Sequence, residues 1–164
     1  MGWLFFKKPQ IAIRSARASD CPDIASLHAE GGFSGSWSAE EIESLIADRA
    51  VITDIACDSR KTDLLFGFVM SRCAADEAEI LTIVTGRKSR GKGFGRRLLE
   101  AHLSKLAGFG VKTLYLEVEE DNKPARALYD KTGFVTAGIR KGYYRKPDGS
   151  SANALIMKLG LDRL

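Results

Sequence analysis

The sequence predicts a single α/β domain, in which a mixed, mostly antiparallel sheet is flanked by helices. The chain has 164 residues, of which 45% are apolar and 28% are charged, as is ordinary for a globular domain. Short apolar stretches separated by polar turns indicate antiparallel neighbouring strands. One strand–helix–strand unit in the middle of the chain adds a parallel pair, because a crossover of that length normally joins strands of the same direction.

The first third of the chain predicts one strand and two helices. Residues 10–14 alternate between apolar and polar side chains, as a half-buried strand does. Ser19-Asp20 can cap a helix that reaches about residue 30 and has a proline in its first turn. Ser38 has an acid three places later, which is the capping-box spacing, and predicts a second helix to about residue 48.

The middle of the chain predicts a meander followed by the crossover. Residues 51–56, 64–71 and 80–85 have strand patterns, and we expect them to pair in antiparallel order. The leucines after the third strand repeat at helical spacing and predict a helix that ends near Gly108. Residues 112–119 form the next strand, which we expect to run parallel to residues 80–85.

The last part of the chain predicts a fourth helix and two further strands. Asn122 can cap this helix, and Gly133 stands where a left-handed residue would end it. Phe134 begins another strand, and residues 154–157 supply the last one. No internal repeat and no low-complexity linker divides the chain.

A glycine-rich loop lies between the strand 80–85 and the leucine-rich helix. It contains Arg-x-x-Gly-x-Gly at residues 90–95, where glycines allow close approach to a ligand and the next helix turns its free N–H groups toward an anion. A Walker A loop is excluded because Gly93, not Ser or Thr, follows Lys92. A dinucleotide fingerprint is excluded because position 96 is Arg. The loop therefore predicts a site for the phosphates of another cofactor, and an ordinary basic turn is the alternative.

Charge is concentrated near this loop. The chain has a formal net charge of +4, and six basic residues lie between Arg87 and Arg97. A nucleic-acid surface is the rival interpretation, but Phe94 is the one aromatic residue in this span, and such surfaces usually interleave several. We expect a phosphate-bearing ligand and no nucleic acid.

Two residues after the loop could carry proton chemistry. Glu117 follows Leu116 in a strand whose alternate residues are apolar, and a carboxylate there is costly unless it is paired or opens into a cleft. Its alternative role is a solvated acid at the strand end, because further acids follow. Tyr129 lies on the fourth helix, where an aromatic side chain is usually part of the core.

Other catalytic and metal chemistry finds little support. The three cysteines are widely separated, without the spacing of a disulfide framework or a zinc site, so we expect packed, reduced thiols and no metal. His28 and His102 fall in helix patterns and are expected to be packed or solvated. No Ser-His-Asp arrangement can be assembled from the sequence.

The chain begins with a short apolar arm. Residues 1–9 contain four consecutive apolar residues, which is far below the length of a signal-peptide core or a membrane span. We therefore expect a single domain over residues 10–164, no membrane span, and a soluble, cytoplasmic protein.

Two ordered motifs identify a family. The spacing Arg90-x-x-Gly93-x-Gly95 resembles the acyl-coenzyme A signature of the Gcn5-related N-acetyltransferase (GNAT) superfamily. The stretch from Asn122 to Phe134 is similar to the closing motif of the same superfamily, and its distance from the first motif is appropriate. The resemblance covers about residues 10–160 and implies the GNAT fold and acetyl-coenzyme A as the acetyl donor.

The resemblance also implies the roles of individual residues. Glu117 matches the base and Tyr129 matches the acid that protonates the departing thiolate, with direct attack of an amine on the thioester. The main chain of the preceding strand would pair with the pantetheine arm, the loop would hold the pyrophosphate, and Asn122 would contact the cofactor arm. The implied donor-binding residues are Ile83, Val84, Thr85, Arg90, Gly91, Lys92, Gly93, Phe94, Gly95, Arg96 and Asn122.

A narrower resemblance rests on Leu116-Glu117-Val118, Arg140 with Tyr143-Tyr144, Asp148-Gly149 and Leu155-Ile156-Met157, and on Trp37-Ser38 ahead of the second helix. Through these features residues 77–158 resemble a bacterial subgroup, the ribosomal-protein-alanine N-acetyltransferases. The resemblance implies acetylation of a protein N-terminus, namely the alanine of ribosomal small-subunit protein eighteen. Lysine, polyamine or small-molecule amine acetylation is the alternative, and a module that binds acyl-coenzyme A or nucleic acid without catalysis is the non-enzyme alternative. Members often have an acid before the final strand, where this chain reads Ser-Ala-Asn-Ala at residues 151–154, so recognition of the protein substrate is open to change.

Overall fold

The computed structural model describes residues 9–33 and 35–162, which form a seven-stranded mixed sheet in the order β1-β2-β3-β4-β5-β7-β6. The predicted fold class is confirmed. All of the predicted N-terminal arm except Pro9 lies outside the described residues. The strands are β1 (Ile11–Ser15), β2 (Val51–Asp58), β3 (Leu65–Ala74), β4 (Glu77–Thr85), β5 (Thr113–Glu119), β6 (Val135–Arg145) and β7 (Ser151–Gly160), and the helices are α1 (Cys21–Glu30), α2 (Ala39–Ala47), α3 (Phe94–Gly108) and α4 (Lys123–Thr132).

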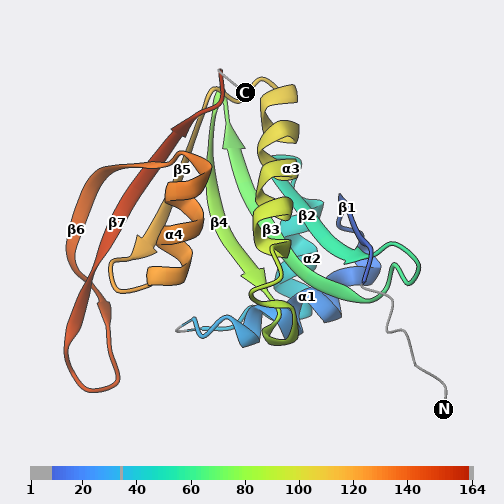
Figure 1. Cartoon of the computed structure of the whole chain (residues 1–164), viewed down its shortest axis with the longest axis horizontal. Helices are drawn as coiled ribbons and strands as arrows, with labels where there is room; N and C mark the ends of the chain where they lie inside the picture. The colour runs from blue at the N-terminus through green and yellow to red at the C-terminus, as the bar shows by residue number, and fades with distance from the viewer. Residues whose placement is uncertain (1–8, 34, 163–164) are drawn as a thin grey trace, which may run out of the picture.

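The helices cover the two faces of the sheet in pairs (Figure 1). One core cluster joins α3 and α4 to the buried face of β5, which includes Leu114 and Leu116. A second cluster packs α1 and α2 against β2 and β3, with Ile55 and Phe68 fully buried. None of the helices in the described part of the chain is long and apolar enough to cross a membrane.

The helix starts follow the predicted signals, with a capping side chain in two cases of three. Ser38 accepts a hydrogen bond from the Glu41 N–H group and completes a capping box with the Glu41 carboxylate, so α2 begins as predicted. Asn122 caps α4. Asp20 stands at the N-cap of α1, as predicted, but its side chain makes no hydrogen bond to that helix. It instead accepts two hydrogen bonds of 2.8 Å from the Arg14 guanidinium, which lowers the pKa of this carboxyl and ties the chain before α1 to β1.

The sheet opens between β4 and β5. The predicted parallel direction is confirmed, but pairing is limited to residues 77–79 of β4 and 113–115 of β5. Leu81 is an extra residue on β4, because the register with β3 passes from Met70↔Thr82 to Ser71↔Ile80. A bulge of this kind bends its strand, and beyond it the two strands diverge (Figure 1). The main chain of residues 80–85 thus has no strand partner on its β5 side, while β5 pairs with β7 over its whole length.

A buried polar chain links α3 to the sheet, which the sequence analysis did not foresee. His102 on α3 lies 2.8 Å from the Ser71 hydroxyl through Nε2 and 2.7 Å from an Asp54 carboxylate oxygen through Nδ1. Lys105 also bonds Asp54. All three members of the Ser-His-Asp chain are at most 2% exposed, so Ser71 has no access to a substrate and the arrangement is structural.

Candidate functional site

The glycine-rich loop follows the end of β4, beyond the stretch in which β4 pairs with β5. Gly91 and Gly93 have φ values of +72° and +76°, and a Cβ atom at either position would meet nothing within 4 Å. These glycines are therefore required for their left-handed backbone and not by crowding. Gly93 is also the N-cap of α3 and supplies no side-chain hydrogen bond to the first turn, so the N–H groups there remain available. The loop and helix end together form an anion-binding concavity.

The first arginine of the motif holds the loop in place. The Arg90 guanidinium donates to the main-chain oxygens of Thr85 and Glu30, at 3.2 and 3.3 Å. The Glu30 carboxylate in turn accepts the Arg87 N–H group at 2.8 Å. These bonds clamp the loop between the end of β4 and the end of α1. Among the motif's other basic residues, Arg96 pairs with Glu100 and Lys92 is exposed.

Tyr129 and Asn122 belong to α4 and its N-cap, on the face of the sheet that α3 and α4 cover. Tyr129 is 5% exposed and packs against Phe134 with ring centroids 5.6 Å apart. Burial raises the pKa of Tyr129 to about 12, so its hydroxyl is a proton donor throughout the neutral range. Asn122 uses its Oδ1 to accept the Ala125 N–H group at 3.3 Å, which leaves its amide N–H groups for a ligand.

Glu117 lies on the opposite face of β5, as the alternating pattern predicted. Its carboxylate is not a solvated strand-end acid, because it accepts a 2.7 Å hydrogen bond from Arg140 on β6. The Arg140 guanidinium also lies 4.0 Å from the ring centroid of Tyr143, and Tyr144 meets Tyr143 edge to face. Burial, with the negative charge of Glu117 nearby, raises the pKa of Tyr144. The sequence analysis missed the role of Arg140, since it lies 23 residues from its partner.

The divergence of β4 from β5 relates these groups. Tyr129 packs in the core that α3 and α4 form with one face of β5, whereas Glu117 is on the other face of β5. Where β4 and β5 diverge, a ligand held by the loop can be reached from both faces. The arrangement can bind a phosphate-bearing molecule between the diverging strands, with a carboxylate on one side and a phenol on the other.

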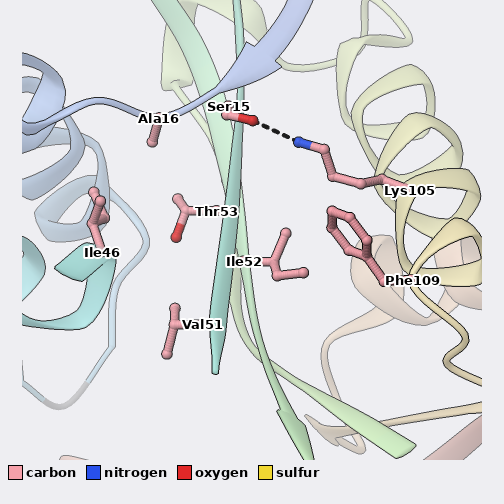
Figure 2. A pocket seen from close by; sticks show the side chains of 8 residues that line it. All are labelled: Ser15, Ala16, Ile46, Val51, Ile52, Thr53, Lys105 and Phe109. Atoms are coloured by element: carbon pink, nitrogen blue, oxygen red, sulfur yellow. Dashed lines mark hydrogen bonds between the residues drawn. The ribbon is translucent and has the colours of Figure 1, made fainter. Parts of the chain in front are cut away.

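A separate hollow of about 230 Å³ lies at the other end of α3, where β1 leaves the edge of β2 (Figure 2). Lys105 and Phe109 reach it from α3, and the Lys105 ammonium donates to the Ser15 hydroxyl at 2.7 Å. None of the predicted site residues lines this hollow. In the described residues no three His, Cys, Asp or Glu side chains are grouped as metal ligands would be.

Comparison with known proteins gives the same family for sequence and structure. The profile of the acetyltransferase (GNAT) family matches residues 22–134. The chain is 32% identical over 148 residues to the ribosomal protein bS18-alanine N-acetyltransferase of Escherichia coli strain K12, covering 90% of this chain and 95% of the relative. It is 43% identical over 93 residues to the protein of that name from Haemophilus influenzae, covering 57% of this chain and 63% of the relative.

Solved structures of acetyltransferases have a similar fold. The crystal structure of the ribosomal-protein-S18-alanine N-acetyltransferase from Escherichia coli matches with a TM-score of 0.82 and 30% identity, over 93% of this chain and 94% of that one. Arabidopsis thaliana NAA60 in complex with acetyl-CoA matches with a TM-score of 0.78 and 20% identity, over 92% of this chain and 98% of that one. At this lower identity the likeness concerns the fold alone.

Proposed function

We propose that this chain, which belongs to the acetyltransferase (GNAT) family and is an N-acetyltransferase, acetylates a protein N-terminus. The acceptor would be the alanine of ribosomal protein bS18, and the donor would be acetyl-coenzyme A. The observation that carries this proposal is the divergence of β4 from β5, with an anion-binding loop after β4 and Glu117 and Tyr129 on the two faces of the sheet. The relatives that act on bS18 by name support the choice of substrate.

The donor would lie where β4 and β5 diverge. The N–H groups of residues 91–96 would bind its pyrophosphate, with Lys92 as the exposed cation, and Arg90 would keep the loop in shape. The main chain of Ile83 to Thr85 would pair with the pantetheine arm, and the Asn122 amide would bind the same arm from α4. When bound, acetyl-coenzyme A supplies the acetyl group as a thioester that an amine can attack. A main-chain N–H group of β4 would polarise the thioester carbonyl.

Glu117 and Tyr129 would divide the proton transfers between them. Glu117, on the acceptor side, would take a proton from the incoming amine, directly or through water. A protein N-terminus suits this role because its pKa is about 7.7–8.0, far below that of lysine at about 10.4. Tyr129 would give its hydroxyl proton to the leaving sulfur. No covalent enzyme intermediate is needed, and the thiols of Cys21 and Cys57 are buried.

Mass spectrometry of a peptide panel tests the proposed function. The panel consists of the bS18 N-terminal peptide with free alanine, the same peptide with a blocked N-terminus, a lysine-containing blocked peptide, and spermidine. We expect an added acetyl group on the free-alanine peptide and on none of the others. Acetylation of lysine or spermidine in preference to the free α-amine would overturn the assignment of substrate.

Gly93→Ala is expected to weaken donor binding about fivefold to thirtyfold. The added methyl group has open space, but alanine in the left-handed conformation costs about 1–2 kcal/mol, so the loop would shift. Calorimetric titration with acetyl-coenzyme A measures the effect. Gly108→Ala is the matched control: it also adds a methyl group to open space, in the same helix but without positive φ, and should leave binding unchanged.

Tyr129→Phe is expected to lower kcat about tenfold at pH 7 and to leave the fold intact. Phenylalanine retains the packing against Phe134, and the loss is moderate because a thiolate of pKa about 8.5 leaves readily without an acid. Because the pKa of Tyr129 is about 12, the phenol stays protonated at pH 10. Wild-type activity should therefore show no fall up to pH 10 that comes from deprotonation of Tyr129. Steady-state rates from pH 6 to 10, with thermal melting as the control, measure both points.

A further inference from the structure

The strand β6 carries a large bulge opposite Asn153. Arg140 pairs with Ala154 and Tyr144 with Ala152, so three residues of β6 face Asn153 alone. Gly142, in the middle of the bulge, has a φ of +63°. Arg140 and Tyr143 lie on either side of Gly142. The Arg140 guanidinium lies over the Tyr143 ring and donates to Glu117. The shape of the bulge therefore determines where this guanidinium lies.

The Asn153 side chain joins the bulge to the end of β5. Its Oδ1 accepts the Gly142 N–H group at 3.0 Å, and its Nδ2 donates to the Glu120 carboxylate at 2.8 Å. Its main-chain oxygen also accepts the Glu120 N–H group at 2.9 Å. An amide can accept and donate at once, whereas a carboxylate at this position would accept from Gly142 but repel Glu120. The sequence analysis noted that an acid is common here, and the structure gives the amide two partners.

We propose that Asn153 is a positioning residue for the reaction: through the bulge it holds Arg140 against Glu117, which keeps this carboxylate an oriented anion on the acceptor side. This inference rests on the proposed function of Glu117. Asn153 itself touches neither the donor nor the amine. Arg140 is exposed on about half of its side chain and Glu117 on about a quarter, so the pair is screened in part and depends on its geometry.

Several other charged or titratable groups surround Glu117. Glu119 follows on the same face of β5 and pairs with Lys146 at 3.6 Å, and Lys146 also bonds Asp121 at 2.6 Å. The opposite residue on β7 is Ile156, which does not titrate. The remaining groups on neighbouring positions are Tyr115, Tyr143, Tyr144, Lys158 and, on β4, Glu79. Among the ion pairs of the described residues, Glu117 takes part in the pair with Arg140.

Four variants test the proposal. Asn153→Ala removes both amide bonds without a change of charge. Asn153→Asp keeps the bond from Gly142 but places two carboxylates side by side. The double variant Asn153→Asp with Glu120→Gln restores the bond in the reverse direction, because the new amide at position 120 can donate to the new carboxylate at position 153, and it has the wild-type net charge. Glu120→Gln alone is the control, since its amide oxygen can still accept from Asn153.

The first readout is kcat for the acceptor peptide at pH 7, measured beside KM for acetyl-coenzyme A. In Asn153→Ala and Asn153→Asp we expect kcat to fall about threefold, because a displaced Arg140 no longer holds the Glu117 carboxylate in its orientation. KM for acetyl-coenzyme A should stay within about twofold. The double variant should restore kcat. A merely structural role would lower the melting temperature without changing kcat of the folded enzyme.

The second readout needs no turnover. NMR signals of the Arg140 guanidinium, assigned with Arg140→Lys, should show the loss of the hydrogen bond to Glu117 in the two single variants and its return in the double variant. Unchanged guanidinium signals in folded Asn153→Ala would overturn the proposal. If wild-type enzyme acetylated no peptide, the proposed function would fail, whereas the guanidinium signals would still decide whether Asn153 positions the pair.

Discussion

Replacing Glu117 by glutamine is expected to lower kcat/KM for the free-alanine peptide by at least about 100-fold, as is typical for the loss of a general base. Glutamine has the same shape and can still accept the Arg140 hydrogen bond through its amide oxygen, but it cannot accept a proton from the amine. Initial rates at saturating acetyl-coenzyme A, measured from pH 5.5 to 9, give the effect.

The control for this substitution is the donor site. Glu117 is on β5 whereas the pyrophosphate loop follows β4, and Glu117 faces away from α3 and α4. The dissociation constant of acetyl-coenzyme A should therefore stay within about twofold of wild type. A Glu117→Gln enzyme with wild-type rates across this pH range would show that another group accepts the proton, even if the chain acetylates the proposed substrate.

The sequence predicted the helix ends, which depend on neighbouring residues, better than the strand register, which depends on residues far apart in the chain. The capping box at Ser38, the cap at Asn122 and the left-handed Gly133 depend on residues within a few positions of one another, and all three are confirmed. The bulge at Leu81 is not visible in the sequence, because it depends on the register with β3. Yet this bulge accompanies the divergence of β4 from β5, on which the site depends.

The candidate site shows the same division. The glycines of the loop were predicted from spacing alone, since a left-handed backbone at a helix start has a recognisable composition. The hydrogen bond from Arg90 to Glu30 joins residues 60 positions apart. Glu117 on β5 and Arg140 on β6 are neighbours because both strands pair with β7. Such partners follow from strand order, which a local pattern does not contain.

His102 is the residue for which the sequence analysis was least informative. A histidine on a helix face is usually packed, and this one is, but its partners come from β2 and β3, 48 and 31 positions away. Its Nδ1 faces the Asp54 carboxylate, which requires a proton on that nitrogen, and its Nε2 can then accept the Ser71 hydroxyl proton. The network therefore fixes α3, which begins at the donor loop, against two strands of the sheet.

Asp54→Ala is expected to lower the free energy of unfolding by about 3–5 kcal/mol, because it leaves the buried His102 and the partly buried Lys105 without their carboxylate. Urea denaturation at pH 7 measures the loss. Asp76→Ala, which removes an exposed pair with Lys112, is the matched control and should have little effect. An equal effect of the two substitutions would contradict a structural role of the buried network.

The loss should also depend on pH in a defined direction. Burial alone would raise the pKa of Asp54, but the hydrogen bonds from His102 and Lys105 prevail and lower it. A carboxyl with a lower pKa in the folded state contributes stability above its unfolded value of about 3.9, and loses it as the pH falls through the folded value. The difference between wild type and Asp54→Ala should thus be constant above about pH 5 and shrink in more acidic solution. A difference that grew with acid would contradict the lowered pKa of Asp54.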